Sequence, residues 1–157
     1  MSSIAILDAI TLLVSDCLDP CDYTIVRGQG ASPLEGCNII SIYPMQSVLT
    51  NPGNKCNHVV EDRVVISVTR CCDTIDGAPQ WDAAREELEA LCQQQTVADL
   101  ETCLECELVS ALKGISLCPE DNAYLENVVW DSMRQGGCYS ATLTVRFMRQ
   151  RCCPIVP

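Results

Sequence analysis

Residues 139–148 read YSATLTVRFM, and this stretch decides the fold class of the 157-residue chain. Its side chains alternate strictly in character: Tyr139, Ala141, Leu143, Val145 and Phe147 are apolar, and the residues between them are Ser140, Thr142, Thr144 and Arg146. Successive side chains of a β-strand point to opposite faces, so this pattern predicts a strand with one apolar and one polar face. A sheet with one apolar face must bury that face against another layer.

Four further segments have the composition of strands, with turn residues between them. Pro44 is expected to end one of them, which would leave residues 44–57 as a loop. Gly136 and Gly137 mark the turn before the last strand. The four segments are residues 23–27, 38–43, 59–70 and 127–131.

The first helix is predicted near the N-terminus. Apolar residues between Ile4 and Val14 cover most of the helix circumference, so this helix should be largely buried, within the domain or against a neighbouring subunit. Asp19 and Pro20 are expected to end it.

A helical middle segment is predicted from about residue 81 to Gly114, which is a typical C-terminal signal. It has two apolar stripes. Thr96 and Asp99 resemble a capping box between these stripes, so the segment is either two helices or one long kinked helix. The first stripe is Ala84, Leu88, Leu91 and Cys92, and the second is Val97, Leu100, Leu104, Leu108, Ala111 and Leu112.

Together these segments predict a single α+β domain over residues 1–157. Its sheet should be mostly antiparallel with four to five strands, and the N-terminal helix and the helical middle segment should pack on one face. Residues 154–157 are expected to form a short extended tail.

Composition narrows the class of protein. Hydrophobic residues make up 48% of the chain and aromatics only 4%, so the core should be aliphatic. A formal net charge of −11 disfavours specific nucleic-acid binding, which needs clustered Lys and Arg. No segment has the apolar length of a membrane span or the pattern of a signal peptide, so we expect no membrane partner and a reducing cytosol.

Thirteen cysteines and one histidine leave three interpretations open: a disulfide scaffold, a metal or redox protein, or thiols used for packing. We favour the third, because the cysteine number is odd and only Cys103 and Cys106 have the C-x₂-C spacing of zinc ligands. A zinc-binding or redox-active cysteine protein is the alternative. If the last two strands form a hairpin, Cys118 and Cys152 are the candidate disulfide.

No constellation of nucleophile, base and oxyanion donors is present in the sequence. His58, the one histidine, opens a strand-like segment and has no recognisable catalytic context. Glutamates of the middle segment, among them Glu101 and Glu105, are expected on a solvated or partner-facing side. We therefore expect no catalytic residue, no cofactor and no metal, in a protein that is not an enzyme.

Three segments, in this order, resemble the tail terminators and related head-to-tail connection proteins of long-tailed (siphovirus-type) phages that infect actinobacteria. The shared features are a strand ending in Tyr-Pro, a strand ending in Arg-Cys, and a Gly-Gly-Cys strand near the C-terminus. The segments are residues 36–44 (GCNIISIYP), 64–71 (VVISVTRC) and 136–145 (GGCYSATLTV).

The resemblance implies a structural virion protein of the phage neck. Such a protein forms a homohexameric ring that caps the tail tube, ends tail polymerisation and joins the tail to the head connector or stopper protein, with a lumen for the genome. It would be found in the virion and, during assembly, in the host cytoplasm. A stopper or adaptor protein of the same junction is the near alternative. The candidate oligomer or partner contacts are Ile4, Leu7, Pro44, Met45, Glu101 and Glu105.

Overall fold

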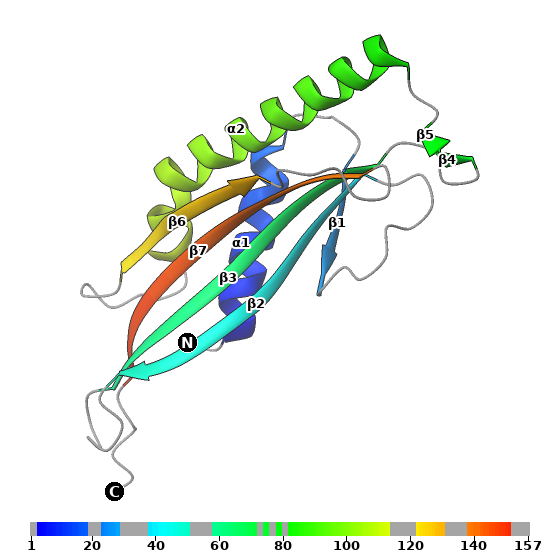
Figure 1. The fold of residues 1–157 in the computed structure, drawn as a ribbon. Helices are drawn as coiled ribbons and strands as arrows, with labels where there is room; N and C mark the ends of the chain where they lie inside the picture. Colours follow the sequence, from blue (N-terminus) through cyan, green and yellow to red (C-terminus); the bar gives the residue numbers. More distant parts are fainter. Residues whose placement is uncertain are drawn as a thin grey trace, which may run out of the picture.

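The computed structural model describes two helices, one large sheet and a small second sheet (Figure 1). The described residues are 3–18, 23–28, 38–50, 58–71, 74–75, 78–79, 82–113, 122–130 and 138–151. The helices are α1 (Ser3–Cys17) and α2 (Ala83–Lys113). The strands are β1 (Thr24–Arg27), β2 (Ile39–Thr50), β3 (His58–Cys71), β4 (Thr74–Ile75), β5 (Ala78–Pro79), β6 (Asn122–Trp130) and β7 (Cys138–Arg151).

The large sheet has the strand order β1-β2-β3-β7-β6. Its long strands pair antiparallel, with Ile66 of β3 between Ile42 of β2 and Leu143 of β7. β1 pairs with β2 in parallel, so the sheet is mixed. The predicted α+β class is confirmed, and the parallel edge is the feature that the sequence did not indicate. β4 and β5 form a separate two-stranded ladder.

Both helices cover one face of the large sheet, with α1 behind the strands in Figure 1 and α2 along the β6 side. At the centre of the core, the side chains of Ile66, Leu143 and Leu100 have no solvent-exposed surface. Burying a side chain of this size stabilises the fold by roughly 1.5–3 kcal/mol. The helices contribute Ile6, Ile10, Leu13, Val14, Val97, Leu100, Leu104, Leu108 and Leu112 to the core. The period-two pattern and the second apolar stripe of the helical segment therefore place the core correctly, whereas Leu88 and Leu91 of the first stripe are exposed.

β2 runs past Pro44 to Thr50, so the predicted end at this proline was wrong. Met45 is an extra residue here: Pro44 pairs with Val64 and Gln46 pairs with Arg63. β1 pairs only with residues 39–42 of β2. At Pro44, therefore, no described strand lies on the outer side of β2 that would need a backbone N–H group from this position. Proline, which lacks an N–H group, is tolerated at such edges and bulges.

α2 is one continuous helix of 31 residues, which decides between the two alternatives for the middle segment. The hydroxyl of Thr96 donates to the backbone carbonyl of Cys92, one turn earlier, at 2.9 Å. A threonine inside a helix bonds back to the preceding turn in this way, whereas an N-cap threonine would accept from the backbone N–H groups that follow it. Thr96 is therefore not an N-cap. The helix ends at Lys113, directly before the predicted stop at Gly114. Neither described helix is long and apolar enough to cross a membrane.

Candidate assembly surface

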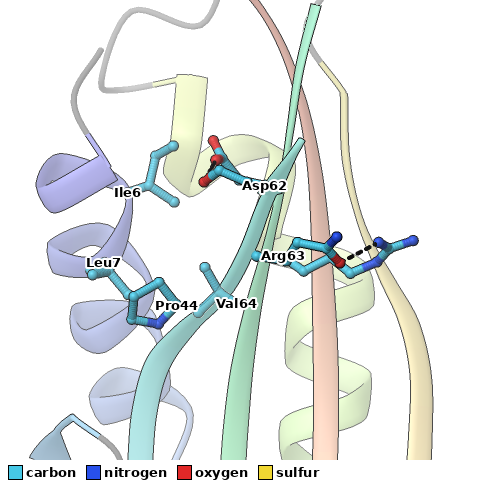
Figure 2. A pocket seen from close by; sticks show the side chains of 8 residues that line it. Ile6, Leu7, Pro44, Asp62, Arg63 and Val64 are labelled. Carbon is cyan, nitrogen blue, oxygen red and sulfur yellow. Dashed lines mark hydrogen bonds between the residues drawn. The ribbon is translucent and has the colours of Figure 1, made fainter. Parts of the chain in front are cut away.

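A hollow lies between the first turns of α1 and the region of β2 and β3 around the bulge (Figure 2). Four of its lining residues are apolar and four polar, although the side chains of Arg63 and Gln46 bond to each other on the other side of the sheet (Figure 2). The lining residues are Ile6, Leu7, Pro44, Gln46, Ser47, Asp62, Arg63 and Val64. The hollow lies beside the bulge at Met45, where α1 packs against β2.

Four of the six candidate contact residues lie at this end of the molecule. Leu7 and Pro44 line the hollow together. Ile4, one turn before Leu7, is 68% exposed, and Met45 in the bulge is 61% exposed. Leu7 of α1 and Pro44 of β2, far apart in sequence, therefore line one partly apolar hollow, and Ile4 and Met45 are exposed neighbours of these two residues along the chain.

The other two candidates, Glu101 and Glu105, lie on α2 and do not line the hollow. Glu105 is exposed and Glu101 is half-buried. They were expected on a solvated or partner-facing side of the helical middle segment, and their role as contacts stays a prediction.

Asp62 is a polar residue of the hollow that the sequence reasoning missed. It stands in the helix-facing row of β3 between Val60 and Val64 and is buried, and it accepts a hydrogen bond from the Ser47 hydroxyl. A carboxylate in an otherwise apolar row of a strand is the signal that could have found it.

The opposite, open face of the sheet carries an ion network over four strands. Arg63 of β3 donates to both carboxylate oxygens of Glu126 on β6, at 2.9 and 3.2 Å, and to Oε1 of Gln46 on β2 at 3.3 Å. Arg146 of β7 donates to Glu61 of β3 at 2.6 Å. Each guanidinium therefore has a carboxylate partner, and the network is balanced in charge.

A bulge aims one member of this network, Glu126. Glu126 is the extra residue between Leu125 and Asn127 of β6, just as Met45 is on β2. The bulge lets Glu126 reach over β7 to Arg63, in keeping with the way bulges redirect side chains.

The pairing shifts the pKa of Arg63, Glu126 and Arg146. Arg63 holds the pKa of Glu126 below its ordinary value, and the hydrogen bond to Glu126 raises the pKa of Arg63. The hydrogen bond to Glu61 likewise raises the pKa of Arg146. Each of these three shifts favours the charged form, so the network holds the open face together rather than supplying a proton donor or acceptor.

A second, more buried ion pair joins β3 to α2. Arg70 donates to Glu89, its guanidinium lies 5.7 Å from the ring centroid of Tyr23, and Glu89 also pairs with Arg85 at 3.0 Å. Burial opposes the charge of Arg70, but Glu89 and Tyr23 outweigh that cost and raise the pKa of the guanidinium. Burial also raises the pKa of Tyr23. Glu89, which lies off the first apolar stripe of the helix, is buried.

The cysteines correct a further expectation. Cys17 of α1 and Cys103 of α2 form a disulfide with Cα atoms 6.1 Å apart, whereas the sequence favoured free thiols. Cys106, which shares the C-x₂-C spacing with Cys103, is an exposed free thiol. Among the described residues, no group of three or more His, Cys, Asp or Glu side chains is placed to hold a metal ion. Cys118 and Cys152 lie outside the described residues.

Comparisons with known proteins assign no family. No family model matches the chain, and no curated protein is significantly similar in sequence. A solved structure titled "Virion of native gene transfer agent (GTA) particle" contains a chain with a similar arrangement, at a TM-score of 0.38 and 12% identity. The likeness covers 95% of this chain and 100% of the other. At that TM-score it does not assign a function.

Proposed function

We propose that this protein is a non-catalytic structural subunit of a phage neck. It assembles with copies of itself into a ring, caps the tail tube, ends tail polymerisation and joins the tail to the head connector. Support from the sequence is the order of its three motifs. Support from the structure is the surface at the end of α1.

That surface is the observation that carries the proposal. Ile4 and Met45 are more than half exposed beside a hollow lined by Leu7 and Pro44. Grouped exposed apolar side chains mark contact surfaces, whereas single ones are ordinary. An acidic protein with a net charge of −11 also suits docking on basic patches of partner proteins.

The test is to measure the mass of the purified protein by light scattering and to image it by negative stain, with and without purified tail tubes. We expect closed rings, free or on tube ends, and tubes that no longer elongate. Tubes incubated with an unrelated acidic protein are the control. A protein that stays monomeric and does not sediment with tubes would contradict the proposal.

The same material separates the terminator role from that of a stopper or adaptor. A terminator binds the ends of bare tail tubes. A stopper or adaptor binds purified head connectors instead and leaves bare tubes free to elongate.

A further inference from the structure

A polar cluster lies where the end of β3 and the residue before β1 meet the first half of α2. Arg70 of β3 donates to Glu89 of α2, and its guanidinium lies 5.7 Å from the ring centroid of Tyr23. Cys92 stands one turn after Glu89 on the helix, and Thr96 stands one turn after Cys92. Residues three and four apart on a helix are neighbours on one face. The cluster therefore places a thiol beside a guanidinium and a phenol.

Two donor atoms of this cluster are buried and have no hydrogen-bond partner in the described part of the chain. They are the hydroxyl of Tyr23 and Nη1 of Arg70. Arg70 as a whole is only 9% exposed. Burial raises the pKa of Tyr23, so its hydroxyl keeps the proton and can donate. Buried donors without an acceptor are costly and uncommon, so the cluster is built to receive an acceptor, and a negatively charged one suits the guanidinium.

The nearby acceptors among the described residues are already engaged. The two carboxylate oxygens of Glu89 accept from Arg70 and from Arg85. The hydroxyl of Thr96 donates to the backbone carbonyl of Cys92 at 2.9 Å. The sulfur of Cys92 is the group of the cluster that can gain a negative charge and serve both donors.

Electrostatic interactions connect this sulfur to both donors. Burial is the main cause of the raised pKa of Tyr23, and a negative charge on Cys92 adds to it. Burial lowers the pKa of Arg70, while Glu89 and, to a smaller extent, a negative charge on Cys92 raise it. Such an interaction is mutual. The guanidinium of Arg70 therefore favours a thiolate at Cys92, to which the protonated hydroxyl of Tyr23 can donate.

We propose that Cys92 is a reactive thiol and a site at which small disulfides modify the protein. The thiolate of Cys92, held by Tyr23 and Arg70, attacks one sulfur of the disulfide. A bond forms between Sγ of Cys92 and that sulfur, and the original S–S bond breaks. The other half leaves as a thiolate and takes a proton from water. The small disulfide is itself the oxidant, and the site is separate from the proposed role in the neck.

The charges around Cys92 come from three elements. Arg70 of β3 favours a thiolate, and Glu89, one turn earlier on α2, opposes it. Both oxygens of Glu89 are engaged by Arg70 and Arg85, which offsets that opposition. Tyr23, directly before β1, contributes a neutral donor. The cluster therefore favours the nucleophilic form of the thiol, whereas a thiol on an open helix surface has no such support.

Cys106 is the matched comparison, because it is an exposed thiol further along the same helix. Cys92 is half-buried. If exposure alone governed the rate of modification, Cys106 would react faster. The cluster predicts the opposite order.

The test measures how fast the cysteines of the intact protein react with hydroxyethyl disulfide, the neutral disulfide of 2-mercaptoethanol, at pH 7. Samples taken over time are quenched with acid, digested and analysed by mass spectrometry. We expect the mixed disulfide to form faster at Cys92 than at Cys106. An equal or faster rate at Cys106 would overturn the inference.

Tyr23→Phe removes one donor and keeps the aromatic ring. It should slow the reaction of Cys92 about 3- to 10-fold, as expected when a thiolate loses one hydrogen bond and regains part of the rate as a stronger nucleophile. The pH profile of the rate at Cys92 should move to higher pH, and the rate at Cys106 should not change. Tyr124→Phe, on the open face of the sheet, should leave both rates as they are. Circular dichroism verifies the fold of both variants. A parent-like rate and pH profile at Cys92 in Tyr23→Phe would show that the cluster does not activate the thiol, and the inference would fail.

Discussion

Arg63 on β3 and Glu126 on β6 form a two-point ion pair that crosses the intervening strand β7. The two N–O distances are 2.9 and 3.2 Å. Directly opposite Arg63 on β7 stands Arg146, so two like charges face each other in the ladder. Like charges in that position destabilise a sheet, and Glu126 and Glu61 offset them. The open face of the sheet is thus held together by balanced charges.

Replacing Glu126 by Gln should reduce the stability of the fold at neutral pH and make that stability less sensitive to a fall in pH. The pKa of Glu126 is lower in the folded protein than its ordinary value of 4.5. Its stabilising effect is therefore complete above the unfolded-state pKa and is lost as the pH falls through the folded-state pKa. Melting temperatures of parent and variant should differ at pH 7 and converge below about pH 4.5.

Glu105→Gln is the matched control for this measurement, because Glu105 is an exposed carboxylate of α2. Its melting curve should follow the parent at every pH. Parallel curves for the parent and Glu126→Gln over the acid range would refute the role given to the Arg63 pair.

Glu89→Gln should be strongly destabilising. Glu89 and Arg70 have side chains only 10% and 11% exposed, so the substitution leaves a buried guanidinium without its carboxylate. Breaking such a pair costs about 3–5 kcal/mol. Denaturant unfolding measures this loss, and Glu87→Gln, an exposed neighbour on α2, should cost less than about 0.5 kcal/mol.

Removing both partners gives a second check on the same pair. Arg70→Met combined with Glu89→Leu should recover most of the lost stability, because apolar residues of similar size can replace a buried ion pair. If the double variant is as unstable as Glu89→Gln alone, the loss comes from packing around α2 and not from an unpaired charge.

Reducing agent should lower the melting temperature of the parent protein. The disulfide between Cys17 and Cys103 closes a loop with a sequence separation of 86. In the chain-entropy view a loop of this length stabilises the fold by about 4–5 kcal/mol. Cys103→Ser should melt at the lower temperature with or without reductant. Cys106→Ser, at an exposed free thiol, should keep the response of the parent, and an equal response in all three proteins would contradict the assignment.

The sequence predicted the elements whose pattern is local. The alternation around Leu143 and the apolar run that includes Ile10 each specify one buried face without reference to the rest of the chain. These segments became β7 and α1 near their expected bounds. β2 was cut short because the effect of Pro44 depends on whether a neighbouring strand needs its N–H group, and that is a tertiary fact.

The candidate site was predictable in part. Ile4 and Met45 are exposed, which does not follow from their being apolar, and their role as contacts stays a prediction. The orientation of the first half of α2 was missed, because Glu89 becomes a buried residue only through Arg70, which lies 19 positions earlier. One signal was available: Glu89, Gln93 and Thr96 continue the face of Leu100 at helical spacing. Nothing in the sequence indicated that Cys17 pairs with Cys103, because the spacing of cysteines does not determine which of them form disulfides.

Deleting Met45 should be tolerated, whereas deleting Ser41 from the same strand should not. Met45 is the extra residue of the bulge, so its deletion joins Pro44 to Gln46 and keeps both of their pairs on β3. Deleting Ser41 instead shifts the following residues by one position and turns Ile42, which is 1% exposed, away from the core. Loss of a buried isoleucine costs about 2–5 kcal/mol.

Circular dichroism and thermal melting measure both deletions. The protein without Met45 should retain its secondary structure and lose at most about 1 kcal/mol. The protein without Ser41 should unfold far more readily or fail to fold. Because Met45 also stands at the rim of the hollow, its deletion should weaken ring assembly more than it weakens the fold. Equal loss of stability from the two deletions would mean that β2 needs the bend at Met45, and that the bulge is part of the sheet's packing rather than a feature of its contact surface.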